Sequence, residues 1–186
     1  MKLKNLYIYI LLFLRCFFIK VYSYDIAIKS DIDNMDKLYL VYDEISKSMK
    51  YREIRIVFDD EEYFIDPRGQ NHFNIYYTLI FYTEKGSILN YSLSYNTSFR
   101  FHFLPESESD IKRLYFKNLT FKDFDGHAWE THLLFFSVDT DKNDFYIEFD
   151  NCTFINITGI LLHMEVTFKQ LQYETPQVLF KNCTFT

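Results

Sequence analysis

The acidic segment DTDKND at 139–144 has the spacing of a metal-binding loop. Its D-x-D-x-N order copies the first half of a calcium loop, in which carboxylate and amide oxygens coordinate the ion. The sixth position of such a loop should be Gly and is Asp144, and the twelfth is Asp150, just beyond the strand-like run Ile147–Phe149. Because a continuous calcium loop cannot contain a strand, we predict a solvated acidic turn and no cofactor, with calcium as the alternative.

Histidines and nearby carboxylates are the other candidate metal ligands. His127, Glu130 and His132 lie close together, but only Glu130 and His132 share a strand face, and no third ligand is evident nearby. We therefore predict no metal site. His163 is expected to be a strand histidine, on a face that the sequence does not assign. Trp129, the only Trp, could stack on a sugar ring, but a single aromatic side chain is weak support.

Six N-x-[ST] sequons are candidate glycosylation sites. They lie at Asn90, Asn96, Asn118, Asn151, Asn156 and Asn182. Those at 118, 151 and 182 arise from a structural repeat, and side chains that turn inward as a ladder cannot carry glycans. Asn90 and Asn96 lie in the polar stretch NYSLSYNTS, which we expect to be a loop, so they are the expected acceptors in a eukaryotic secretory host.

Residues 1–23 have the order of regions that is typical of a secretory signal peptide. Two lysines precede nine apolar residues, Leu6–Leu14, and a cleavage site follows at Val21-Tyr22-Ser23. The apolar run is too short to span a membrane, which takes about 20 residues. An uncleaved anchor over residues 6–22 is the alternative. We predict cleavage after Ser23, and a secreted, extracellular protein with no stable membrane span in the mature chain.

The composition excludes several classes of protein. The chain has 186 residues, the length of one domain, and its four Gly and three Pro exclude collagen and flexible linkers. Removal of the leader takes away four of the 20 Lys and Arg and none of the 26 Asp and Glu, which leaves a net charge of −10. Such an acidic chain disfavours nucleic acid and acidic lipids as partners.

A repeat predicts the fold. Three segments, 114–121, 147–154 and 178–185, align without a gap at spacings of 33 and 31 residues. They share the pattern apolar-x-Phe-x-Asn-[Leu/Cys]-Thr-Phe. The alternation of apolar residues shifts by one after the Asn, and Asn tolerates the left-handed backbone conformation that bends a strand sharply. Each copy therefore predicts two short strands joined by an Asn bend, with Thr facing solvent.

One copy plus the strand-like run that follows it completes a circuit, so stacked copies predict a parallel β-helix. Less regular runs upstream extend it to about four coils over residues 54–186, and two of these runs, Thr78–Tyr82 and Ser87–Leu89, are predicted to be strands joined by a turn around Gly86. Phe116, Phe149 and Phe180 should stack on one another, and so should the Phe residues at 121, 154 and 185. Residues 24–53 form a short strand and an amphipathic helix, which we expect to cap the N-terminal end of the core. The expected class is therefore all-β, with one capping α-helix.

The capping helix, the Asn bends and the C-T-F strands resemble the right-handed parallel β-helix of the pectin-lyase-like superfamily, over residues 25–186. Similarity to its pectate lyases implies a calcium ion and an Arg base, and similarity to its polygalacturonases implies N-T-D, D-D and G-H-G motifs. Of the polygalacturonase motifs, this chain has no N-T-D, its D-D pair (Asp59-Asp60) lies at a bend, and Gly126-His127 lacks the second Gly. No Arg follows Arg113, so the later coils have no Arg base of the pectate lyase kind. No catalytic residue is therefore assigned.

The expected function is a binding or structural role at the cell exterior, adhesin-like and directed at a polysaccharide or another cell-surface protein. The alternative is an extracellular polysaccharide lyase or glycoside hydrolase whose active site lies outside this chain. Whether the protein is an enzyme is left open, with a binding role favoured.

Two features of the last coils stay open at this stage. Cys152 and Cys183 share one inward position on neighbouring coils, at a distance that permits a disulfide, but parallel stacked side chains do not favour its dihedral angle. We expect two buried thiols. The last coil would leave Phe180, Cys183 and Phe185 partly exposed, which predicts either a longer β-helix truncated at the C-terminus or end-to-end self-association.

Overall fold

The computed structural model describes residues 22–30, 32–48, 51–65, 72–92, 99–104, 111–126, 131–139, 145–167 and 177–186. The expected leader up to residue 21 lies outside these ranges, as do residues 127–130 and 140–144 and the sequon at Asn96. No helix in the described part of the chain is both long enough and apolar enough to cross a bilayer.

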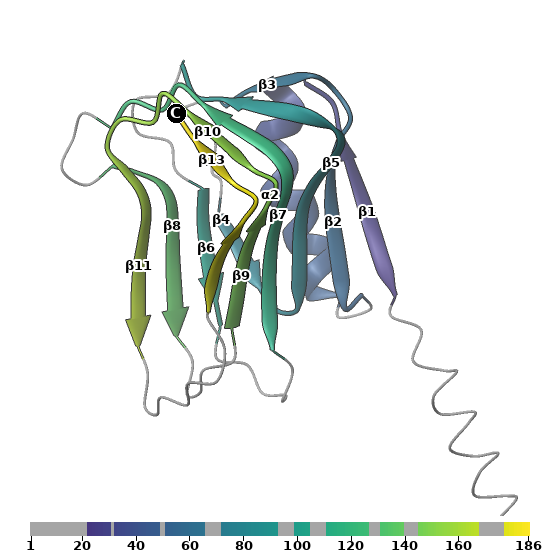
Figure 1. Cartoon of the computed structure of the whole chain (residues 1–186). Coiled ribbons are helices and arrows are strands. Elements are labelled where there is room, and N and C mark those ends of the chain that lie inside the picture. The colour runs from purple at the N-terminus through teal and green to yellow at the C-terminus, as the bar shows by residue number, and fades with distance from the viewer. Residues whose placement is uncertain are drawn as a thin grey trace, which may run out of the picture.

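The chain winds into a parallel β-solenoid of about four turns, which confirms the predicted architecture (Figure 1). The first elements are β1 (Ser23–Ile28), α2 (Ile32–Lys47), β2 (Glu53–Phe58), β3 (Glu62–Phe64), β4 (His72–Ile75), β5 (Thr78–Asn90) and β6 (Phe99–Phe103). The later ones are β7 (Lys112–Lys122), β8 (His132–Asp139), β9 (Phe145–Asp150), β10 (Thr153–Ile155), β11 (Ile160–Thr167), β12 (Val178–Lys181) and β13 (Thr184–Phe185).

Two sheets enclose the core. The nine-stranded sheet runs β1-β2-β5-β7-β10-β13, with β3 beside β5 and with β9 between β7 and β12. The four-stranded sheet runs β4-β6-β8-β11, and its strands β8 and β11 lie at the left of Figure 1. Every ladder between these strands is parallel, so each residue lies beside its counterpart one turn away.

Helix α2 packs over the N-terminal end of the core, where the sequence predicted a cap. Leu38 and Tyr42 on this helix are buried. The Tyr42 hydroxyl donates a hydrogen bond to the Asn74 carbonyl oxygen at 2.7 Å, and its ring lies edge-on to Phe73, with 5.4 Å between centroids. This contact joins the helix to β4, the first strand of the four-stranded sheet.

The predicted asparagine bends are present. Asn118, Asn151 and Asn182 have φ values of 59°, 55° and 53°, all in the left-handed region. The Asn118 amide nitrogen donates to the Thr83 carbonyl oxygen at 3.0 Å, and the Asn151 amide nitrogen donates to Asn118 Oδ1 at 3.0 Å. These asparagines form a ladder, but it runs along the outer surface rather than inward, since Asn118 is half-buried and Asn151 is exposed.

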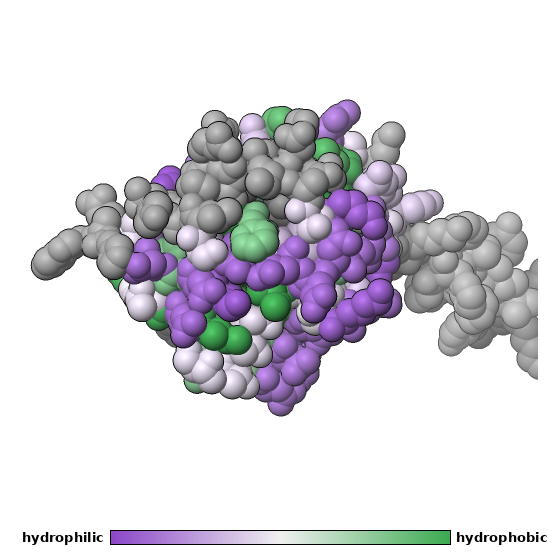
Figure 2. Space-filling view, turned by 90° about the horizontal axis from the view of Figure 1, so that it is seen from above, coloured by the Kyte–Doolittle hydropathy of each residue, from purple (hydrophilic) through white to green (hydrophobic). Residues whose placement is uncertain are grey.

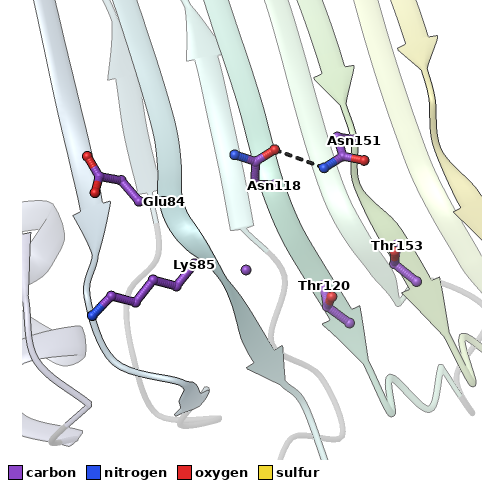
Figure 3. A pocket seen from close by; sticks show the side chains of 7 residues that line it. Glu84, Lys85, Asn118, Thr120, Asn151 and Thr153 are labelled. Carbon is purple, nitrogen blue, oxygen red and sulfur yellow. Dashed lines mark hydrogen bonds between the residues drawn. The ribbon is translucent and has the colours of Figure 1, made fainter.

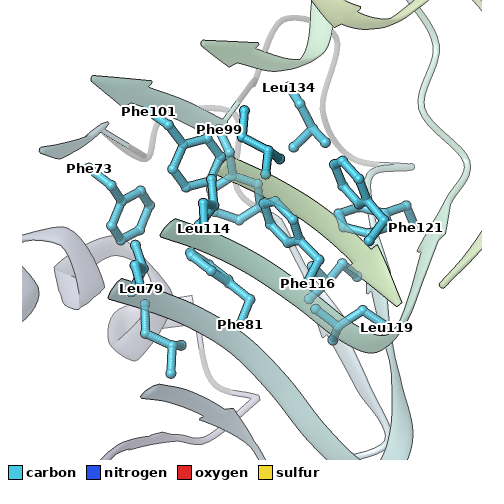
Figure 4. Packing of buried hydrophobic residues seen from close by; sticks show 14 of the residues in the cluster. Phe73, Leu79, Phe81, Phe99, Phe101, Leu114, Phe116, Leu119, Phe121 and Leu134 are labelled. Atoms are coloured by element: carbon cyan, nitrogen blue, oxygen red, sulfur yellow. The ribbon is translucent and has the colours of Figure 1, made fainter. Parts of the chain in front are cut away.

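Aromatic and aliphatic side chains pack together in the core (Figure 4), and the two columns of stacked rings that the repeat predicted are present. The Phe116 and Phe149 centroids lie 4.7 Å apart and those of Phe149 and Phe180 lie 4.6 Å apart, with the ring planes within 6° of parallel. The second column, formed by the Phe residues at 121, 154 and 185, has spacings of 5.0 and 4.9 Å. Stacking extends to the preceding turn through Phe81, which lies 5.2 Å from Phe116.

The last described turn is partly open. Phe180 and Phe185 are 38% and 56% exposed. Cys152 and Cys183 are free thiols, as expected, but only Cys152 is buried; Cys183 is half-buried because it lies on the last described turn. Burial is the main cause that raises the pKa of Cys152 to about 12, so its thiol stays protonated and apolar in character. Truncation and end-to-end association stay predictions.

Substitution in the aromatic stack should have a cost that depends on position. Phe149→Ala should lower the free energy of unfolding by about 3–5 kcal/mol, because the buried ring lies between two others and its loss leaves a cavity. Phe180→Ala removes the same ring from the exposed end of the same column and should cost less. Urea unfolding followed by circular dichroism measures both, and equal costs would contradict the stacked core.

The Asn bend should favour Gly over Ala. Asn151→Ala should cost about 1–2 kcal/mol in backbone strain, because a Cβ disfavours the left-handed conformation. It should also lose the bond to Asn118, worth about 1 kcal/mol. Asn151→Gly loses that bond without the strain. Thermal unfolding of the two variants decides the point: if Gly were no better than Ala, the bend would not depend on the left-handed conformation.

Candidate functional site

Most of the sequence-predicted metal ligands lie at the edge of the described chain or beyond it. Residues 140–144 and 127–130, which include His127, Trp129 and Glu130, are outside the described ranges. Asp150 is the last residue of β9, so the second half of the calcium-like segment is a strand, as the sequence analysis argued. No group of three His, Cys, Asp or Glu side chains comes together at metal-binding distance among the described residues.

The candidate ligand His132 contacts His163 on the four-stranded sheet. The rings of His132 and His163 stack at 4.3 Å, and His163 Nε2 lies 3.6 Å from Glu165 Oε1. The Phe135 ring stacks on His163 at 5.3 Å. The face of His163, which the sequence did not assign, is therefore the outer face of this sheet, beside other aromatic side chains.

Asp59 and Asp60 lie between β2 and β3. The Asp60 carboxylate accepts a hydrogen bond from the Ser30 backbone amide at 2.6 Å, and that bond is the main cause that lowers the pKa of Asp60. The carboxylate therefore ties the end of β1 to the first bend. The backbone amide and the side chain of Ser30 are both hydrogen-bond partners of this carboxylate.

Gly126 marks a close approach between two turns. A Cβ added at Gly159, whose φ is 105°, would come within 3.1 Å of the Gly126 Cα atom. Only glycine fits such an approach and tolerates such a φ. Gly126, the glycine of the incomplete G-H-G motif, therefore has a steric role in stacking the turns.

One predicted glycan acceptor is wrong for the folded chain. The sequence placed Asn90 in a loop, but it is the last residue of β5 and is 5% exposed. Its amide nitrogen donates to Glu62 Oε1 at 2.7 Å. The reason is that β5 does not end at a turn around Gly86: it continues to Asn90 through an irregularity in register between Tyr82 and Ser87.

That irregularity builds a groove on the outside of the nine-stranded sheet. The groove has a volume of about 350 Å³. Its lining residues are Glu84, Lys85, Gly86, Asn118, Thr120, Asn151 and Thr153. In Figure 3 the Glu84 and Lys85 side chains stand on one side, and the bonded asparagines and the threonines lie on the strands opposite.

The bulged segment that forms one wall is held by its own hydrogen bonds. Gly86 has a φ of 86°, which glycine alone adopts without strain. Ser87 Oγ lies 2.9 Å from Thr83 Oγ1 and 2.7 Å from the Asp60 carbonyl oxygen. Both side chains are buried, so the wall is anchored to the preceding turn rather than free at the surface.

The opposite wall repeats from turn to turn. Thr120 and Thr153 are register partners, and both are half-buried on the outer face of the sheet. Asn118 and Asn151 hold equivalent positions two residues earlier. Neighbouring strands lie about 4.8 Å apart, so the groove presents amide and hydroxyl groups at a regular interval. These groups can exchange hydrogen bonds with a hydroxyl-rich ligand.

The repeated wall of the groove can be predicted from the sequence, and the wall formed by Glu84 and Lys85 cannot. The outward Thr and the bent Asn followed from the three aligned copies. Glu84 and Lys85 have no counterpart in that pattern, and the one signal that could have found them is Gly86, placed between two β-rich runs. A glycine inside a strand pattern indicates a bulge as well as a turn.

Beside the groove, the outer face of β1, β2, β5, β7, β9 and β12 has balanced charges. Its acids are Asp25, Glu53, Glu148 and Asp150. Its bases are Arg55, Arg113, Lys117 and Lys181. Several of them pair: Arg55 Nε lies 2.7 Å from Asp25 Oδ1, and Lys181 Nζ lies 3.4 Å from Asp150 Oδ2. The face has no net formal charge, in a chain whose net charge is −6.

The fold and the site define a parallel β-solenoid with a polar groove on its outer surface. No protein-family model matches the chain, and no curated protein or solved structure matches it.

Acid should destabilise the four-stranded sheet through His72 and His102. Burial, and then the neighbouring Arg100, lower the pKa of each imidazole. The unfolded chain therefore binds more protons, and stability is lost as the pH falls below about 6.5. Urea unfolding at pH 7 and pH 5 should show a smaller loss in His102→Gln than in the unsubstituted chain. An equal loss would contradict this assignment.

Proposed function

We propose that this protein binds carbohydrate outside the cell, as a secreted or cell-surface β-solenoid. The observation that carries the proposal is the repeated wall of the groove, where Asn118 and Thr120 on one turn have the same positions as Asn151 and Thr153 on the next. A polysaccharide is itself a repeat of hydroxyl groups, so a row of matched donors and acceptors suits it.

The charge of the groove supports an uncharged partner over an ionic one. Glu84 and Lys85 are the charged side chains among the described lining residues, and they have opposite signs. Seen from above, the described surface of the molecule is mainly hydrophilic, with apolar side chains scattered among polar ones (Figure 2). Such a surface favours contacts with polar ligands over burial against an apolar one.

The rigidity of the site also supports binding. The asparagines are held by a bond between their side chains, and the bulged wall is held by buried hydroxyl groups. A site that is already ordered loses little conformational entropy when a ligand binds. A solenoid can therefore present this groove without a change in backbone conformation.

Membership of the pectin-lyase-like superfamily belongs to the same proposal. The parallel turns, the left-handed asparagines and the stacked phenylalanines support it. Hydrolysis of a glycosidic bond commonly requires two carboxylates, and Glu84 is the one carboxylate among the described lining residues. The groove thus supports binding; a lyase or hydrolase site in other parts of a longer protein stays a prediction.

Removal of two hydroxyl groups should weaken binding. Thr120→Val together with Thr153→Val keeps the shape of the wall but loses two hydrogen bonds, each worth about 1 kcal/mol, so affinity should fall about tenfold or more. Affinity electrophoresis through gels that contain a soluble β-glucan or galactomannan measures the change. Thr167→Val, on the four-stranded sheet, is the matched control and should bind normally.

Two outcomes would contradict the proposal. The first is the absence of retardation by any polysaccharide in a panel of plant and microbial polymers. The second is retardation that the double Thr variant leaves unchanged, since binding would then occur elsewhere on the molecule. Release of soluble sugars by the chain alone would replace the binding function with a catalytic one.

A further inference from the structure

Three tyrosines lie along a diagonal across three adjacent strands, on the outer face of the nine-stranded sheet. Tyr82, Tyr115 and Tyr146 come from β5, β7 and β9, and each is half-buried. The Tyr115 and Tyr146 ring centroids are 5.9 Å apart. We call these three residues, with Ile80, the tyrosine face.

Ile80 shows that this face is closely packed. Its side chain is 8% exposed, yet it is not part of the hydrophobic core, because its neighbours Leu79 and Phe81 point inward and Ile80 points outward. Its register partners are Arg55 and Tyr115. The outer surface therefore has a small apolar centre of its own, surrounded by charged pairs.

Polar contacts fix the tyrosine rings in position. The Tyr146 hydroxyl donates to Glu148 Oε2 at 2.7 Å, a bond that raises the pKa of Tyr146 to about 12. Lys117 Nζ lies 4.9 Å from the centre of the Tyr115 ring. Burial, and then the negative charge of Glu84 together with a hydrogen bond to it, raise the pKa of Tyr82, and burial raises the pKa of Tyr115. All three phenols therefore keep their protons over the physiological range.

The tyrosine face is continuous with the groove. Glu84, the partner of Tyr82, stands in the groove wall. Lys117 and Asp150 directly precede Asn118 and Asn151, which lie at the bends, so the two surfaces meet without an intervening loop. A ligand longer than the groove would extend onto the tyrosines.

The charge balance of this outer face indicates what kind of ligand it fits. Its four acids and four bases cancel, and its paired charges are already neutralised within the protein. A polyanion gains little from such a surface and is repelled by the acidic chain as a whole. An uncharged ligand is not repelled by the acidic chain and does not depend on an electrostatic gain.

The outer face of the six strands β1, β2, β5, β7, β9 and β12, which contains the tyrosine face, is small for an interface with a stable protein partner. From strand geometry, five residues along six strands cover about 17 Å by about 24 Å, or about 400 Å². Each partner in a standard protein interface buries about 800 Å². A single extended polymer chain needs less width. Tyrosine supplies both an apolar ring and a hydroxyl group with few rotatable bonds, which suits the C–H faces and hydroxyl groups of sugar rings.

We infer that the tyrosine face extends the groove and that the two together bind an uncharged polysaccharide, with Tyr115 as its central contact. This inference rests on the proposed function and adds the ligand class and a second part of the site. Tyr115 packs against the C–H face of a sugar ring, while Tyr82 and Tyr146 keep their hydroxyl groups at its edges.

Isothermal titration of the full chain with an uncharged β-glucan, and separately with polygalacturonate, tests the inference. Tyr115→Ala should weaken binding of the uncharged polymer about tenfold or more, and Tyr115→Phe, which keeps the ring, should weaken it less. Phe64→Ala removes a 39% exposed ring from β3, away from the tyrosine face, and should bind normally. Added salt should change affinity little, because no net charge is neutralised.

Each outcome has a distinct meaning. Unchanged affinity in a folded Tyr115→Ala variant, or tighter binding of polygalacturonate than of the uncharged polymer, would overturn the inference. If the double Thr variant lost binding while Tyr115→Ala kept it, the proposed function would stand and the inference would fail. If neither polymer bound, both would fail. Circular dichroism reports folding, and Tyr82→Ala is judged by the same criterion if Tyr115→Ala unfolds.

Discussion

Parallel strands form hydrogen bonds in register, so every turn of this protein must place its side chains beside their counterparts in the turn before. Because strands lie about 4.8 Å apart, Phe116 and Phe149 come to 4.7 Å in the core. The same register brings Asn118 and Asn151 into hydrogen-bond contact on the surface. The aromatic core, the bends and the polar ladder are three results of a single geometric constraint.

The bend is what makes this register compatible with a closed core. Asn151 adopts a left-handed conformation, so the apolar residues before and after it both point inward although they are an odd number of positions apart. Phe149 precedes the bend and Phe154 follows it, and both rings are buried. Without the bend, the residues after it would point to the opposite face and the second aromatic column could not form.

Candidate binding surfaces arise where the repeat is irregular. Exact copies give flat ladders, and Thr120 and Thr153 alone would form a featureless row. The bulge between Tyr82 and Ser87 raises Glu84 and Lys85 beside that row and turns it into a groove. The less regular second turn therefore supplies the shape, and the regular third and fourth turns supply the repeated polar groups.

The sequence alone determined the features that repeat. Three aligned copies established the strands, the asparagine bends and the two aromatic columns, because identical positions in a parallel solenoid must stack. It fails where no copy exists for comparison: the sequence predicts a turn at Gly86, where the structure has a bulge, and a loop at Asn90, which lies buried in β5. The sequence also does not predict that Tyr82, Tyr115 and Tyr146 lie on one face. These tyrosines do not share a position in the repeat, and only the tertiary register between successive turns brings them together.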